Sequence, residues 1–284
     1  MDRIRRGWAL TKQSWAVLRS DRSLVIFPIL SATFALVAAT AIWVPTAIAS
    51  DMLGSGTVDE NDPVYYIAGA ATVYVTTFIA IFFNVALAAC AARSLRGEDT
   101  KVGDGLAAAL HRIGPILGWT FVAGTISLIL RALEERAPAL GRIAVWIAGA
   151  AWAIATFFVI PVIAFEGSGP WRSLKRSVAV VKEKWGEGAT GTVAVSAITG
   201  LLIFAIILVA GATGGALFAV GQQPLGIAVA AIAVMAVIVV AIVSSALSEI
   251  FRVAVYEYAV TGQTPGGFDG GLLQTAFDGH TRRR

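Results

Sequence analysis

The chain of 284 residues has little of what most soluble proteins and enzymes depend on. Only 14% of its residues are charged, against about a quarter in soluble domains, and it has one cysteine and two histidines. A single cysteine excludes an intrachain disulfide and a metal site built on thiolates. Between Glu187 and Glu249, 61 consecutive residues carry no charge, a stretch that a bilayer buries and a soluble domain does not.

What the chain has instead is apolar blocks. Hydrophobic residues make up 57% of it, and each block is about as long as the roughly 20 residues that a helix needs to cross hydrocarbon. None shows the period-two alternation of a membrane β-barrel. The sequence therefore predicts an all-α, polytopic membrane protein, with one six-helix domain over residues 1–262 and a flexible cytoplasmic tail over 263–284. The expected spans are residues 24–49, 64–92, 113–130, 143–165, 189–220 and 225–251.

Two details of the last spans can be predicted more closely. The uncharged run is long enough for two crossings, which a tight turn at Gly221–Pro224 would join. No helix breaker lies between Leu225 and Gly262, so we expect the last helix to continue beyond the bilayer.

The distribution of basic residues predicts the orientation. With the N-terminus in the cytoplasm, the outer segments hold only Arg131, Arg136 and Arg142 of the 22 lysines and arginines. The first outer segment, Ser50–Pro63, has four acidic residues and no basic one. Because lysine and arginine concentrate in cytoplasmic segments, both termini are expected in the cytoplasm, in a multi-pass protein of the cell membrane.

A polar segment with one apolar face precedes each odd-numbered span. These segments, Ile4–Leu18, Val102–Ile113 and Trp171–Trp185, are typical of amphipathic helices at the cytoplasmic surface, either in the lipid interface or packed on the bundle. The first and third share the letters K-x-S-x-A-V, at Lys12–Val17 and Lys175–Val180. The pattern suggests three repeats of a surface helix followed by a two-span hairpin.

Two stretches, Pro161–Ser177 and Ala246–Gly262, carry a family resemblance. They resemble an uncharacterised family of six-span prokaryotic membrane proteins, known only as a domain of unknown function. The layout is also similar to the membrane domain of some glycerophosphodiester phosphodiesterases, whose catalytic barrel and its histidine and glutamate motifs have no counterpart here. The resemblance implies a fold and a location, and no activity.

No arrangement of residues in the chain is typical of catalysis. His111 and His280 are its only histidines, and it has no H-E-x-x-H, G-x-S-x-G or phosphate-binding G-x-x-x-x-G-K-[ST] motif. We therefore expect a non-enzymatic protein with no catalytic residues, no cofactor and no metal site.

The strongest candidate for function is a basic cluster. Since a basic residue beside anionic lipid gains about 1 kcal/mol, this cluster predicts a surface for lipid headgroups. The alternative is that these charges only fix the topology of the chain. The residues are Arg172, Lys175, Arg176, Lys182 and Lys184, flanked by Trp171 and Trp185.

Four further residues are candidates for a cavity or gate. Asn84 lies well inside a span, where an amide either fixes helix packing or contacts a substrate. Glu249 and Arg252 are three residues apart at the cytoplasmic end of the last span, a spacing typical of a local ion pair or of a gate. Glu166, which follows the fourth span, has the spacing to pair with a base of the third surface helix.

The expected function is that of an integral membrane protein of unknown activity that organises or binds anionic lipid. The alternative is a transporter of a small solute or lipid, with a cavity between the repeats. The expected partners are the bilayer and its anionic lipids, and not nucleic acid, because the positive charge follows the cytoplasmic segments. A homo-oligomer is compatible with the sequence.

Overall fold

The computed structural model describes residues 12–49, 63–136, 138–184 and 190–268, which hold helices and no strand. A helix over residues 12–20 comes first. The others, in chain order, are η1 (Arg22–Val25), α2 (Ile26–Ala49), α4 (Pro63–Leu95), α5 (Val102–His111), α6 (Ile113–Arg136), α7 (Ala139–Ala155), α8 (Val159–Glu166), α9 (Pro170–Lys184), α10 (Thr190–Ala219) and α11 (Gln223–Thr261).

Six helical segments in the described part of the chain are long and apolar enough to cross a membrane, which confirms the predicted fold class. The fourth consists of two helices, because α7 ends at Ala155 and α8 starts at Val159. As predicted, α10 and α11 are joined by a turn at Gly221, where φ is 78°. Also as predicted, the last helix continues past residue 251, to Thr261.

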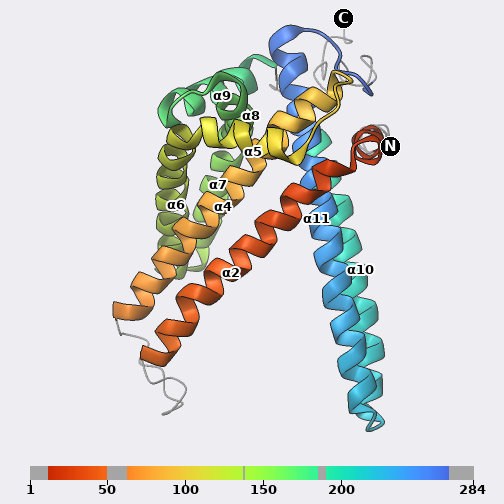
Figure 1. Ribbon diagram of the computed structural model, residues 1–284. Helices are drawn as coiled ribbons and strands as arrows, with labels where there is room; N and C mark the ends of the chain where they lie inside the picture. The colour runs from red at the N-terminus through yellow and green to blue at the C-terminus, as the bar shows by residue number, and fades with distance from the viewer. Residues whose placement is uncertain (1–11, 50–62, 137, 185–189, 269–284) are drawn as a thin grey trace, which may run out of the picture.

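The short helices gather at one end of the bundle, which we call the surface-helix end (Figure 1). The helix over residues 12–20, α5 and α9 lie there, together with the start of α2 and the last turns of α11. From this end α2 and α4 lean to one side and the α10–α11 hairpin to the other, so that the long helices diverge (Figure 1). That the short helices lie on a membrane surface stays a prediction.

The core of the bundle lies near the surface-helix end. The last four turns of α4 form its centre, with Val85, Leu87 and Cys90 fully buried. Phe27 of α2, Phe158 and Phe251 of α11 are almost fully buried around it. By contrast, only 6% of the most apolar 18-residue stretch of α11 is buried. On this helix the side chains of Leu225, Ile227 and Ile232 are more than half exposed. Such a surface is suited to lipid rather than water.

Residues assigned to the tail by sequence contribute to this core. Gly266 donates its backbone N–H to the carbonyl of Leu95, and the Phe268 side chain is 8% exposed. Gly267 lies against Val17 of the first helix. The chain therefore packs on the bundle as far as residue 268, and the rest of the predicted tail lies outside the described residues.

The burial pattern supports an internal repeat. In both copies of K-x-S-x-A-V the lysine and alanine are exposed, and the serine and valine are buried. The four positions are Lys12, Ser14, Ala16 and Val17 in one copy, and Lys175, Ser177, Ala179 and Val180 in the other. In addition, a glycine with positive φ follows each even-numbered span: Gly97, Gly167 and Gly262. Glycine is favoured there because other residues are strained in this conformation.

The close approach of α5 to α4 requires glycine at position 105. A Cβ at Gly105 would lie 2.6 Å from the Phe27 ring, 2.8 Å from the Ala86 carbonyl oxygen and 2.8 Å from the Cys90 sulfur. We expect Gly105→Ala to destabilise the protein by roughly 1–3 kcal/mol, because the backbone carbonyl cannot move aside. The measurement is thermal unfolding of the purified protein in detergent.

Gly103 is the matched control, since it lies on the same helix and a Cβ there meets nothing within 4 Å. Gly103→Ala should leave the unfolding temperature unchanged or raise it slightly. Equal destabilisation by both substitutions would contradict the proposed packing.

Candidate functional site

Two buried serines fix the position of the surface helix α9, Ser177 through the fourth span and Ser173 through the loop that leads into α9. The Ser177 hydroxyl donates to the carbonyl of Ala155 (2.7 Å) and accepts the backbone N–H of Phe158 (3.0 Å). It thereby satisfies both backbone groups where the fourth span breaks between α7 and α8. Ser173 donates to the carbonyl of Ser168 (2.9 Å). The face that α9 presents to the bundle is thus fixed.

Glu166 connects three helices at this end. Its carboxylate oxygen Oε1 accepts the phenol of Tyr256 on α11 (2.7 Å) and the guanidinium Nε of Arg176 on α9 (3.0 Å). The hydrogen bond from Arg176 to Glu166 raises the pKa of the Arg176 guanidinium above its ordinary value. Glu166 therefore makes the pairing with the third surface helix that the sequence predicted.

Three of the five headgroup candidates form an exposed cationic edge on α9. Arg172, Lys175 and Lys182 are exposed, and none makes an ion pair with another described residue. Trp171, beside them, is 67% exposed. Arg176 differs because its guanidinium forms an ion pair with Glu166. The Lys184 side chain and Trp185 lie outside the part that the structure describes.

Glu249 and Arg252 form the ion pair that their spacing predicted. The Arg252 guanidinium donates to Oε2 of Glu249 at 2.7 Å, and Glu249 is 2% exposed. The guanidinium also lies over the ring of Phe157, 5.1 Å from its centroid, in a cation–π contact. The other carboxylate oxygen of Glu249 and Nε of Arg252 are buried without a hydrogen-bond partner in the described structure.

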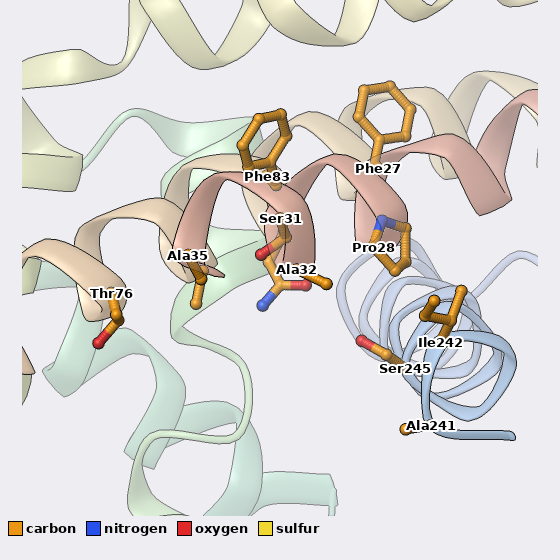
Figure 2. Close-up of a pocket in the computed structure, with 12 residues that line it drawn as sticks. Phe27, Pro28, Ser31, Ala32, Ala35, Thr76, Phe83, Ala241, Ile242 and Ser245 are labelled. Atoms are coloured by element: carbon orange, nitrogen blue, oxygen red, sulfur yellow. The ribbon is translucent and has the colours of Figure 1, made fainter. Parts of the chain in front are cut away.

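Asn84 lines a cavity of about 270 Å³ between α2, α4 and α11. Ser31 on α2 and Ser245 on α11 lie on facing sides of it (Figure 2). Phe27, Pro28 and Ile242 belong to its apolar wall. Glu249 and Arg252 do not line this cavity, so the structure does not bring the four cavity or gate candidates together.

The sequence had a signal for Ser245 and Tyr256, which were not among the candidates. Ser245, Glu249, Arg252 and Tyr256 repeat every three or four positions on α11, which places them on one helical stripe. The partners of that stripe, such as Glu166 for Tyr256, are 90 residues away in the chain and have no local signal.

The side chains at these sites supply charge and hydrogen bonds. Among the residues that the structure describes, no group of three or more histidine, cysteine or acidic side chains is placed to hold a metal ion. Glu166, Glu249 and their bases form structural pairs. What is left for ligands is the cationic edge of α9 and the cavity.

Comparison with protein families matches residues 64–268 to a family of unknown function (DUF6159). The match covers more than half of the chain and extends from the start of α4 to Phe268. Neither curated proteins nor solved structures give a match.

The docking of α9 can be tested at Ser177. Ser177→Ala leaves a backbone carbonyl and a backbone N–H without their partner, so we expect a loss of roughly 1–3 kcal/mol of stability. Thermal unfolding in detergent measures the change. Ser14→Ala, the same motif position in the first copy, should cost nothing, because the Ser14 hydroxyl is buried without a partner in the described structure. Equal losses at both serines would contradict this role of Ser177.

Proposed function

The chain belongs to this family of unknown function, and we propose that it is a non-enzymatic protein of the cell membrane that binds anionic lipid through its surface helices. Its termini would then lie in the cytoplasm, where the surface-helix end faces the inner leaflet. The distribution of lysine and arginine supports this orientation.

The observation that carries the proposal is the cationic edge of α9. Because Ser173, Ser177 and Arg176 face the bundle, Arg172, Lys175 and Lys182 are held outward. Basic side chains next to an exposed tryptophan are typical of a helix that lies at the headgroup level of a bilayer. Each such cation adds about 1 kcal/mol of attraction to an anionic leaflet.

The first surface helix supports the same role, because it exposes Trp15 (49%) and Arg19 at the same end of the bundle. We also propose that the layout is that of the membrane domain attached to some glycerophosphodiester phosphodiesterases, in which we would expect contact with lipid. Several weak basic contacts on one rigid face add up to a stable association.

Transport of a small solute or lipid is the second candidate. The cavity favours it, because Asn84 lines a space between helices of the first and the third proposed repeats. Transporter sites often lie between such repeats, near the middle of the membrane. Uptake of labelled solutes or lipids by proteoliposomes, with an Asn84→Leu variant as the comparison, tests this candidate.

Removal of the cationic edge should weaken binding to anionic lipid. For the triple variant Arg172→Gln, Lys175→Gln, Lys182→Gln we expect a loss of up to about 3 kcal/mol, or roughly a hundredfold in affinity. Native mass spectrometry of the purified protein with phosphatidylglycerol measures the bound lipid. Thermal unfolding should be unchanged, since these side chains make no ion pair in the described structure.

The matched control removes the same charge from the other end of the bundle: Arg131→Gln, Arg136→Gln, Arg142→Gln. This variant should bind phosphatidylglycerol as the unaltered protein does. If both triple variants lost binding equally, net charge rather than the α9 edge would be responsible, and the proposal would fail.

The orientation can be tested with single cysteines. The native Cys90 is fully buried, so it should not react with a membrane-impermeant maleimide. In intact cells we expect the reagent to label a Glu134→Cys variant at the end of α6. A Gln263→Cys variant, next to the end of α11, should react only after permeabilisation. The reverse pattern would place the surface-helix end outside the cell.

A further inference from the structure

The cavity between α2, α4 and α11 has hydrogen-bonding groups without partners. Ser31, Asn84 and Ser245 line it from three different helices, and none of these side chains hydrogen bonds to another described residue. Thr76, which also lines the cavity, differs because its hydroxyl donates to the carbonyl of Thr72 (2.6 Å). Unpaired polar groups are costly in hydrocarbon, so three that converge on one space indicate a ligand that pairs with them.

The lining defines the chemistry of that ligand. None of the residues that line the cavity is charged, so a charged group would lose its hydration without gaining a counter-ion. An asparagine amide both donates and accepts hydrogen bonds, as does each serine hydroxyl. The complementary group is therefore one that does both, such as an uncharged hydroxyl. Phe27, Pro28, Phe83 and Ile242 provide apolar contact for the rest of the molecule.

The cavity is open at one edge, which we expect to face the bilayer. It lies where α2 and α11 begin to diverge from the surface-helix end (Figure 1), and Ala32, Ala241 and Ser245 at its edge are exposed. A molecule dissolved in the membrane can enter between these helices. The volume of about 270 Å³ lies near the lower end of the roughly 300–1,000 Å³ of ligand pockets, so we expect the cavity to hold the polar part of a lipid and not its chains.

We propose that this cavity binds an uncharged lipid with a free hydroxyl, of the diacylglycerol class. The hydroxyl lies among Ser31, Asn84 and Ser245, and the acyl chains extend between α2 and α11 into the bilayer. The site is independent of the proposed binding of anionic lipid, because none of the residues of the cationic edge lines the cavity.

The experiment uses the full chain in detergent micelles and 1,2-dioleoylglycerol as the probe. Native mass spectrometry measures the bound lipid, and thermal unfolding measures the stabilisation. We expect the protein to bind dioleoylglycerol, and Asn84→Leu or Ser245→Ala to weaken binding by roughly three- to tenfold. Thr76→Val is the matched control and should bind as the unaltered protein does, because the Thr76 hydroxyl is already paired.

Comparison ligands test whether the site recognises the free hydroxyl of a neutral lipid or that of a soluble solute. Dioleoylglycerol acetylated at its hydroxyl, and phosphatidylglycerol, should bind to the unaltered protein no better than to Asn84→Leu. If free glycerol alone stabilised the unaltered protein and not Asn84→Leu, the site would belong to a soluble solute and the lipid proposal would be overturned. Equal binding of dioleoylglycerol by all variants, or of its acetylated form by the unaltered protein, would also overturn it.

A second variant keeps the site testable if Asn84→Leu fails to fold. Ser31→Ala with Ser245→Ala removes two hydroxyls at almost no change in volume, so the fold should persist where Asn84→Leu fails. Without ligand, this double variant is expected to unfold at the same temperature as the unaltered protein. Dioleoylglycerol should raise the unfolding temperature of the unaltered protein but not that of the double variant. Stabilisation equal to that of the unaltered protein would refute the site.

Discussion

The cost of an unpaired polar group in hydrocarbon is the constraint on which this structure depends. Glu249 is almost fully buried, and Arg252 pairs with it one turn along the same helix. Glu166 holds both Arg176 and Tyr256. The break in the fourth span frees a carbonyl and an N–H, and Ser177 pairs with both. All these pairs lie near the surface-helix end, although the second carboxylate oxygen of Glu249 and Nε of Arg252 have no hydrogen-bond partner in the described structure.

This concentration distinguishes two parts of the molecule by how tightly they are packed. Near the surface-helix end, buried aromatic side chains, helix caps and inter-helix hydrogen bonds hold the elements together. Farther away, α10 and α11 pack mainly on each other, with a hydrogen bond from Thr199 to Ser244 between them. Helices that are apolar on every side gain little from packing on each other in lipid, because lipid tails are equally apolar. The diverging helices follow from this lack of preference.

The sequence was sufficient for the elements and insufficient for their connections. Long uncharged blocks predicted the six spans, since only a bilayer accommodates them. The break at residues 156–158 precedes Pro161, which has no N–H to donate to the carbonyl of Phe157 and whose ring crowds that carbonyl, so the sequence does signal the break. The side chain that pairs with the Ala155 carbonyl and the Phe158 N–H is Ser177, which lies some 20 residues later in the chain and has no local signal. Arg176 was grouped with the headgroup candidates because sequence reveals a charge and not its partner. The cavity beside Asn84 depends on the angle between α2 and α11, which apolar sequence does not encode.

Both proposed lipid sites follow from the cost of removing charged and polar groups from water. At the exposed edge of α9, cations stay hydrated and attract an anionic headgroup without removing it from water. In the cavity, hydrated charge is excluded, and an uncharged hydroxyl can replace the missing partners of Asn84 and the two serines. A charged lipid therefore gains nothing from the cavity, and a neutral lipid gains little from the edge. In this proposal, selectivity between the two classes comes from the charges present at the edge and absent from the lining of the cavity.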